Sequence, residues 1–194
     1  MIRHGETPWS RSGQHTGRTD IPLTEFGERQ AFALRERLGH LRPALVLSSP
    51  RSRALETARL AGLTPEIVDA DLGEWDYGDY EGLTTTEIRR TVPGWSIWTH
   101  PTPGGETADE VGARVDRVLE LARRGLADGP VVVFSHGHLS RVIGARWIGL
   151  SPLDGRRFTL GTAAACVLSA ERGSPVISHW NIPNPARRDP QEDA

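Results

Sequence analysis

The chain has 194 residues, 37% of them hydrophobic and 25% charged, which suits a folded domain with one sizeable core. Its net charge of −2 gives no indication of binding to nucleic acid or to a membrane surface. The sequence shows no apolar run long enough to span a bilayer and no signal-peptide layout. The chain has a single cysteine, Cys166, which excludes an intrachain disulfide and a thiolate metal cluster. All 23 basic residues are arginine, and the absence of lysine excludes Schiff-base catalysis and lysine-based phosphate binding.

The first candidate strand lies at the front of the chain. Arg3 and His4 resemble residues at the end of a strand, yet only Met1 and Ile2 precede them. A central strand normally has about 5 residues. Either this strand is unusually short or the recorded start is truncated.

Further strands and helices alternate along the chain. Residues 45–47 and 131–134 are continuous apolar runs, typical of parallel strands covered on both faces, while 65–68, 163–168 and 175–178 are additional strand candidates. This alternation predicts an α/β fold. We expect one domain over residues 1–182 and a flexible, proline-containing tail over 183–194.

Capping residues and helical periodicity predict the helices. One helix is predicted after Thr24, which is a good N-cap and is followed by an apolar stripe. A second helix is predicted after the capping box that Thr107 and Glu110 form, and a third apolar stripe predicts a helix over 139–150. The segment 72–105 is irregular apart from a short helix expected after Thr84. Irregular segments of this length are usually functional.

Polar residues follow three of the predicted strands at the point where each strand ends. They are Arg3-His4-Gly5-Glu6-Thr7, the run Ser-Ser-Pro-Arg-Ser-Arg-Ala at 48–54, and Ser135-His136-Gly137-His138. In an open α/β sheet, ligands bind just outside the carboxyl ends of the strands. We therefore expect these residues to meet, with the glycines after His4 and His136 leaving room for a ligand.

With these blocks in this order, the chain resembles the histidine phosphatase superfamily, the phosphoglycerate-mutase-like proteins. The similarity covers roughly residues 1–150 and extends the first block with Trp9, Gly17, Asp20 and 22–24. The other blocks are Arg53-Ala54 with Thr57-Ala58, 72–78 with Glu81-Gly82, and Ser135-His136-Gly137. Four blocks in register are a specific signal. The resemblance implies a three-layer αβα fold with a mostly parallel open sheet and helices on both faces.

The resemblance also implies a role for each matching residue. His4 is the expected nucleophile, and Glu74 matches the proton donor. The expected phosphate clamp is Arg3, Arg53 and His136. Substrate-side positions are Ser10, where many relatives have asparagine, and Thr16, Gly17, Tyr77, Gly137 and His138.

The chemistry of phosphoryl transfer supports these roles independently. The transferred group spreads negative charge over its oxygens, and arginine forks are preorganised donors for it. Two guanidinium groups near His4 favour its neutral form, which is the nucleophilic form. Glu74 can protonate the leaving alkoxide and then accept a proton from water.

Other interpretations of these residues stay open. His136 and His138 could be metal ligands, although no further ligand cluster supports them, and Glu74 could be a structural ion-pair partner. His15 is either functional or a turn residue. The tryptophans at 75, 95 and 98 either line a substrate mouth or pack in the core.

We expect a cytoplasmic phosphomonoesterase that uses neither metal nor cofactor. Similarity of 74–82, Trp9 and Trp98 to the sedoheptulose-1,7-bisphosphatase branch favours a sugar bisphosphate, or another small sugar phosphate, as the substrate. The nearest rival is a 2,3-bisphosphoglycerate-dependent phosphoglycerate mutase, which resembles the chain in the clamp but carries a longer, lysine-containing insertion. A non-catalytic phospholigand-binding module and a metal-dependent hydrolase are further alternatives. The expected partner is a small phosphate ester, without nucleic acid or membrane, and a homodimer is left open.

Overall fold

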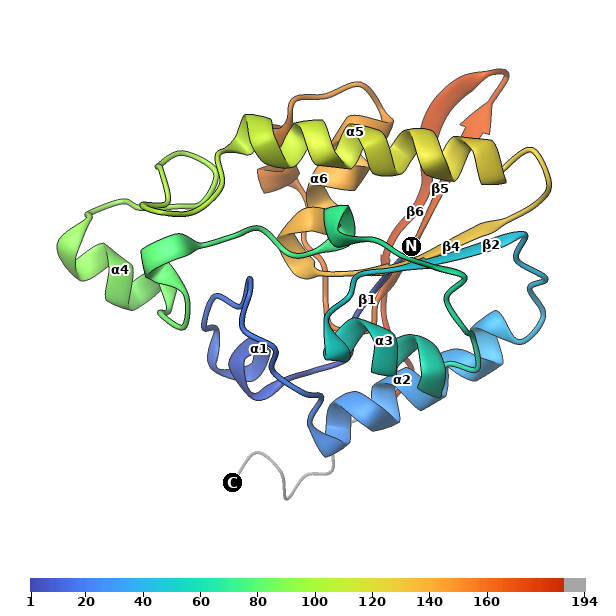
Figure 1. Ribbon diagram of the computed structural model, residues 1–194, viewed down its shortest axis with the longest axis horizontal. Coiled ribbons are helices and arrows are strands. Elements are labelled where there is room, and N and C mark those ends of the chain that lie inside the picture. The colour runs from blue at the N-terminus through green and yellow to red at the C-terminus, as the bar shows by residue number, and fades with distance from the viewer. Residues whose placement is uncertain (187–194) are drawn as a thin grey trace.

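A mixed β-sheet forms the centre of the fold in the computed structural model, which describes residues 1–186 (Figure 1). Its strand order is β3-β2-β4-β1-β5-β6. The four parallel strands are β1 (Ile2–Arg3), β2 (Leu45–Ser48), β3 (Ile67–Val68) and β4 (Val131–Ser135). β5 (Ala165–Glu171) and β6 (Ser174–Ile182) form an antiparallel hairpin that joins the sheet beside β1. The predicted mostly parallel sheet is confirmed.

Helices cover both faces of the sheet (Figure 1). α2 (Glu25–Leu38) and α3 (Ser52–Leu60) lie on one face, and α5 (Ala108–Gly125) and α6 (Gly137–Trp147) lie on the other. Alternate strand residues reach the two layers: Leu47 and Val133 join the core beneath α5 and α6, whereas Val46 and Val132 join the core beneath α2. The three-layer αβα fold is therefore confirmed.

Side-chain caps begin three of the helices at the predicted residues. Thr24 accepts the Gly27 N–H, and capping boxes at Thr107 and Thr84 begin α5 and α4 (Thr85–Thr91). Helix α1 (Pro8–Ser12) was not predicted, because five residues are too few to show an apolar period. Thr7 and Ser10 form its capping box.

The segment between β3 and α5 contains 3₁₀ turns η1 (Ala70–Leu72) and η2 (Gly78–Tyr80) besides α4. A third, η3 (Pro152–Arg157), connects α6 to β5. Trp75 and Trp95 are each 1% exposed and Trp98 is 7% exposed, so they pack in the core. Core packing is the correct one of the two interpretations of these tryptophans.

β1 delivers His4 to the carboxyl edge of the sheet. Ile2 pairs with Phe134 and Ala165, and Arg3 pairs with Ser135. The loop after His4 then meets the start of α2 so closely that a Cβ on Gly5 would lie 2.4 Å from the Gly27 carbonyl oxygen. Glycine is required there because any side chain would collide with backbone.

The end of the described chain is anchored to this fold. The amide nitrogen of Asn184 donates to the carbonyl of Gln30 at 2.9 Å. Most of the predicted tail, 187–194, lies outside the described residues. Among residues 1–186, no helix combines the length and the apolar composition that a membrane span requires.

Candidate active site

A pocket of about 290 Å³ opens at the carboxyl edge of the sheet. The predicted site residues that line it are Arg3, His4, Ser10, Thr16, Glu74, Tyr77, Gly137 and His138. Gly13, Gln14, His15, Thr85, Arg141 and Leu160 complete the lining. Gly17, Arg53 and His136 are not part of it. Residues distant in sequence therefore converge on one pocket, as the strand-end pattern predicts.

His4 is held as a neutral imidazole with a defined tautomer. Its Nδ1 lies 2.6 Å from the carbonyl oxygen of Gly5, which can only accept, so Nδ1 carries the proton. The lone pair of Nε2 is then free for attack. Burial, followed by the charges of Arg3 and Arg53, lowers the pKa of His4 well below its ordinary value.

Arg53 and His136 lie behind His4 rather than in the pocket wall. Both are fully buried, and the His136 ring centroid is 5.2 Å from that of His4. The Nε–H of Arg53 donates to Nδ1 of His136 at 3.2 Å, so Nε2 of His136 carries the proton and donates to Ser49 Oγ at 2.7 Å. Burial lowers the pKa of His136 well below its ordinary value, with Arg53 the next cause.

The remaining donors of Arg53 organise the loop that forms the pocket rim. They reach the carbonyls of Thr16, Gly17 and Thr19 at 3.0–3.2 Å. The Gly17 N–H in turn donates to the carboxylate of Glu81. Gly17 thus shapes the rim through its backbone, whereas Thr16 lines the pocket itself.

Glu74 is fixed by the N-terminus of α6. Its Oε1 accepts the N–H groups of Trp75 and Leu139 at 2.9 and 2.8 Å, and its Oε2 accepts the N–H of His138 at 2.9 Å. Oε2 therefore keeps one lone pair for a proton. A carboxyl group beside Arg3 and His4 in the same pocket is suitably placed for proton transfer.

Gly137 separates Arg3 from Glu74. A Cβ at this position would lie 3.3 Å from the Arg3 Cζ and 3.5 Å from the Glu74 Oε2. Arg3 donates from Nη1 to the carbonyl of Leu160, while its buried Nε–H has no hydrogen-bond partner among the described residues. An unpaired buried donor beside His4 fits an anionic ligand.

An aromatic wall forms another side of the pocket. The Tyr77 hydroxyl is 2.6 Å from Nδ1 of His138, and the His15 ring lies 4.6 Å from the Tyr77 ring. Burial lowers the pKa of His15 to about 4 and that of His138 well below its ordinary value, so both are neutral near pH 7. Burial also raises the pKa of Tyr77, which keeps its hydroxyl protonated.

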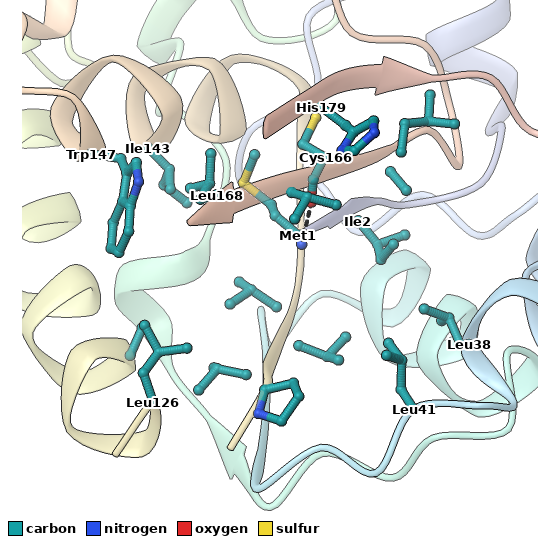
Figure 2. A pocket seen from close by; sticks show the side chains of 18 of the residues that line it. Met1, Ile2, Leu38, Leu41, Leu126, Ile143, Trp147, Cys166, Leu168 and His179 are labelled. Carbon is teal, nitrogen blue, oxygen red and sulfur yellow. Dashed lines mark hydrogen bonds between the residues drawn. The ribbon is translucent and has the colours of Figure 1, made fainter. Parts of the chain in front are cut away.

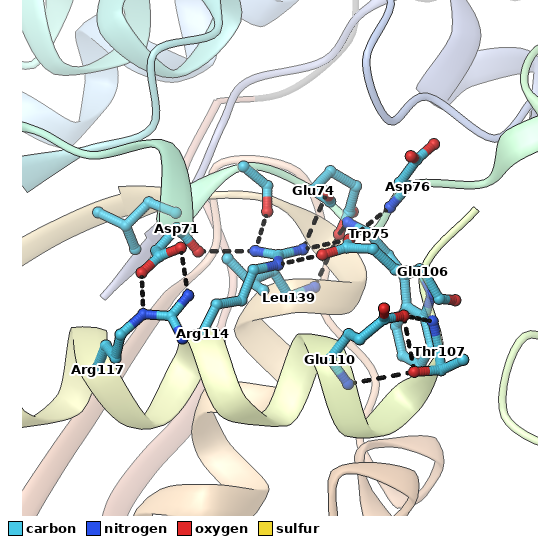
Figure 3. A network of polar contacts seen from close by, with 12 residues as sticks. Asp71, Glu74, Trp75, Asp76, Glu106, Thr107, Glu110, Arg114, Arg117 and Leu139 are labelled. Carbon is cyan, nitrogen blue, oxygen red and sulfur yellow. Dashed lines mark hydrogen bonds and ion pairs between the residues drawn. The ribbon is translucent and has the colours of Figure 1, made fainter. Parts of the chain in front are cut away.

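Arg114 on α5 holds the segment that carries Glu74 (Figure 3). Its Nη1 donates to the carbonyls of Asp71 and Gly73 at 2.7 Å each, and its Nη2 donates to the carbonyl of Glu74 at 3.1 Å. The same guanidinium forms a two-point ion pair with Glu106. Glu106 also accepts the N–H of Asp76 at 2.9 Å, so one network fixes both flanks of Glu74.

The sequence interpretation missed Arg141 and Arg114. Arg141 lines the pocket three residues after His138, on the same face of α6, and helical spacing from His138 could have indicated it. Its guanidinium lies 4.6 Å from the Trp98 ring and donates to the Gly155 carbonyl at 3.0 Å. Nothing in the local sequence marks Arg114, since the carbonyls that it binds are 40–43 residues away along the chain.

Metal binding at His136 and His138 has no structural support within residues 1–186. No group of three His, Cys, Asp or Glu side chains there could hold an ion together. Both nitrogens of His136 are already engaged, by Arg53 and Ser49.

Comparisons with known proteins define the class. Residues 1–183 match the family model for the histidine phosphatase superfamily (branch 1), and the chain belongs to this superfamily. It is a phosphoric monoester hydrolase.

Particular relatives agree with this assignment. The chain is 45% identical over 175 residues to an acid phosphatase of Mycobacterium tuberculosis, covering 89% of this chain and 86% of the relative. It is 39% identical over 181 residues to the sedoheptulose 1,7-bisphosphatase of Saccharomyces cerevisiae, covering 77% and 67%. A solved structure of an open reading frame product from Mycobacterium tuberculosis superimposes with a TM-score of 0.90 at 43% identity, covering 93% of this chain and 95% of that one.

Proposed function

We propose that the chain is a metal-independent phosphomonoesterase that hydrolyses a small sugar phosphate, preferably a bisphosphate, through a phosphohistidine on His4. The observation that carries the proposal is the tautomer of His4. The hydrogen bond from Nδ1 to Gly5 leaves the Nε2 lone pair free beside Arg3 and Glu74. An uncharged imidazole with this orientation is prepared to attack phosphorus.

The proposed reaction has two steps. In the first, the His4 Nε2 lone pair attacks phosphorus, the ester P–O bond breaks, and Glu74 gives its proton to the leaving alkoxide. In the second, water attacks the phosphohistidine, the P–N bond breaks, and Glu74 accepts the proton from water. Neutral His4, inorganic phosphate and protonated Glu74 are restored.

The surroundings stabilise the charges of both steps. Positive charge that develops on the His4 ring strengthens the hydrogen bond from Nδ1–H to the Gly5 carbonyl. The unpaired Nε–H of Arg3 is available to a phosphoryl oxygen. Arg53 and His136, which the sequence placed in the clamp, lie outside the pocket lining and are engaged by other groups of the chain, so we infer that they act on the site indirectly. The buried Arg53 guanidinium charge helps to keep His4 neutral.

Arg141 supports a bisphosphate rather than a monophosphate as the substrate. It brings a second guanidinium to a pocket that already contains Arg3, and it is held by Trp98 and the Gly155 carbonyl. A second phosphate on the same sugar could pair with it. The similarity to a sedoheptulose 1,7-bisphosphatase agrees with this substrate class.

The substrate class is tested by comparing kcat/KM for a ketose bisphosphate, the matching monophosphate and p-nitrophenyl phosphate. We expect the bisphosphate to be preferred. Arg141→Gln should reduce kcat/KM on the bisphosphate about 10- to 100-fold, the value of a charge-assisted hydrogen bond, and reduce it less on p-nitrophenyl phosphate. Equal losses on all three esters would refute a role in binding a second phosphate.

The intermediate is tested by rapid quenching with a ³²P-labelled ester. Label should appear on the parent chain and vanish, with turnover, in His4→Ala; the exposed His40→Ala is the matched control. Glu74→Gln should accumulate label and show a burst of released alcohol. Full turnover by His4→Ala with an intact circular dichroism spectrum would overturn the mechanism.

The phosphoglycerate mutase alternative makes a different prediction in the same assay. A mutase requires 2,3-bisphosphoglycerate for activity, whereas a hydrolase releases phosphate without it. The chain has no lysine and a compact segment between Glu74 and His136. We therefore expect phosphate release that does not depend on added 2,3-bisphosphoglycerate.

A further inference from the structure

Backbone pairing holds the chain ahead of His4. The amino group of Met1 donates to the Cys166 carbonyl at 3.0 Å (Figure 2), and the Cys166 N–H donates back to the Met1 carbonyl at 2.9 Å. β1 then pairs with β4, and the N–H of His4 donates to the Ser135 carbonyl at 2.9 Å. These bonds fix the position of the His4 backbone and leave the orientation of its imidazole ring to the loop that follows.

Two buried side chains hold the loop after His4. Thr57 Oγ1 accepts the N–H of Gly5 at 3.0 Å, and Gln30 Oε1 accepts the N–H of Glu6 at 2.9 Å. Thr57 on α3 is 0% exposed and Gln30 on α2 is 6% exposed, and both lie outside the lining of the pocket. Their route to the site is therefore the backbone of this loop.

The peptide between Gly5 and Glu6 connects Gln30 to the imidazole of His4. This peptide is trans, so its carbonyl and its N–H point in opposite directions and turn together. The N–H donates to Gln30, and the carbonyl oxygen lies 2.6 Å from Nδ1 of His4. A group that fixes the N–H therefore also fixes the carbonyl that sets the tautomer of His4.

The amide of Gln30 binds in one orientation. The N–H of Glu6 can only donate, so the amide atom that faces it is the oxygen Oε1. The NH₂ group then faces Thr162 and donates to its Oγ1 at 3.0 Å. Because both ends of the amide are engaged, its oxygen is held in place for the Glu6 N–H.

We propose that Gln30 is a positioning residue, which keeps the proton of His4 on Nδ1 by locking the peptide between Gly5 and Glu6. A lock is needed because a glycine allows the peptide after it to rotate. A rotated peptide would turn its N–H toward Nδ1, which would then have to accept, and the imidazole proton would move to Nε2. Nε2 is the nitrogen that attacks phosphorus, so this inference rests on the proposed phosphohistidine mechanism.

The same bond assists once His4 attacks. Positive charge then develops on the ring, and the hydrogen bond from Nδ1–H to the Gly5 carbonyl becomes charge-assisted. An acceptor on the Glu6 N–H polarises the peptide and makes its carbonyl a stronger acceptor. Loss of the Gln30 amide should therefore slow phosphoryl transfer to His4 and have little effect on substrate binding, since Gln30 lies outside the pocket lining.

The test measures phosphoryl transfer in a single turnover, by rapid quenching of excess enzyme with ³²P-labelled p-nitrophenyl phosphate. Gln30→Met loses the acceptor at similar side-chain length, and it should slow label transfer about 10- to 100-fold with little change in the enzyme concentration that gives half the maximal rate. Gln30→Glu keeps an acceptor for the Glu6 N–H and should retain most of the parent rate. Thr162→Val is the matched control, because it removes the other bond of the same amide, and it should transfer label at nearly the parent rate. Gln30→Leu takes the place of Gln30→Met if circular dichroism shows that the methionine variant does not fold.

A second measurement follows the tautomer directly. Nitrogen-15 spectra of ring-labelled histidine, with the His4 signals assigned from His4→Ala, should show Nδ1 protonated and Nε2 unprotonated in the parent at pH 7.5. In Gln30→Met, part of the His4 population should change to the tautomer with Nε2 protonated. A loss of stability alone would not produce that change.

Label transfer by Gln30→Met as fast as by Thr162→Val, or an unchanged His4 tautomer in Gln30→Met, would overturn the inference while leaving the phosphohistidine mechanism in place. A Gln30→Glu variant as slow as Gln30→Met would also overturn it, because the acceptor would then not be the cause. A parent chain that takes up no label would defeat the phosphohistidine mechanism, and this inference with it.

Discussion

Acidification should destabilise the folded chain much more steeply than its surface charge suggests, because four buried histidines are neutral. Burial lowers the pKa of His4, His136 and His138 well below the ordinary value, and that of His15 to about 4. In the unfolded chain, each of them regains a pKa near 6.5. The unfolded state thus binds more protons below that pH, and stability falls as the pH falls.

The size of the effect follows from proton uptake. Consider a histidine that stays neutral in the folded chain and has a pKa of about 6.5 in the unfolded chain. Lowering the pH from 7.5 to 5.5 reduces the free energy of unfolding by about 1.3 kcal/mol for each such residue. Four such residues cost about 5 kcal/mol, within a total stability that is typically 5–15 kcal/mol. The loss of stability due to His15 continues as the pH falls and ends near the folded-state pKa of His15, about 4. Unfolded carboxylates titrate mainly below this window, and the buried amino group of Met1 acts in the same direction.

The assay is urea unfolding followed by tryptophan fluorescence at pH 7.5 and 5.5. With an m-value of about 2 kcal/mol/M, the midpoint should fall by about 2.5 M. His15→Gln should reduce the difference between the two pH values by about 1.3 kcal/mol. The assignment of neutral buried histidines would be refuted if the free energy of unfolding differed by less than about 2 kcal/mol between the two pH values. It would also be refuted if His15→Gln left that difference unchanged.

Three further predictions concern the site. Gly137→Ala should lower kcat/KM about 10-fold, because its Cβ would lie 3.3 Å from the Arg3 Cζ and displace that guanidinium. Gly161→Ala, whose Cβ meets nothing closer than 3.7 Å, should retain activity, and similar rates for the two variants would contradict this packing argument. Arg114→Met should lower kcat about 10- to 100-fold with little change in KM, and destabilise the fold by about 3–5 kcal/mol, as Glu106 loses its partner. Arg117→Met removes an exposed pair with Asp71, so it should leave both stability and activity nearly unchanged. Equal kinetic losses in these two α5 variants would show that Arg114 does not position Glu74. Turnover should persist after prolonged dialysis against a chelator, and loss of activity that a divalent ion restores would exclude the metal-independent mechanism.

The sequence determined the parts of this protein that depend on neighbours along the chain. The apolar runs at 45–47 and 131–134 correspond to β2 and β4 in the structure, and α4 and α5 begin at the capping boxes of Thr84 and Thr107. These signals are local, since a cap joins groups three residues apart and a buried strand needs only a short apolar run. The strand-end position of His4 and of the 135–138 block also predicted one shared pocket.

Only the tertiary structure decided how the pocket is divided and held. Arg53 and His136, 83 residues apart, bond to each other behind His4 instead of lining the cavity, and Glu74 takes its orientation from the N–H groups of residues 64 and 65 positions further along the chain. Arg141 and Arg114 acquire their roles from carbonyls and side chains supplied by other elements. No periodicity or motif encodes such contacts, because they exist only once the sheet has brought the strand ends together.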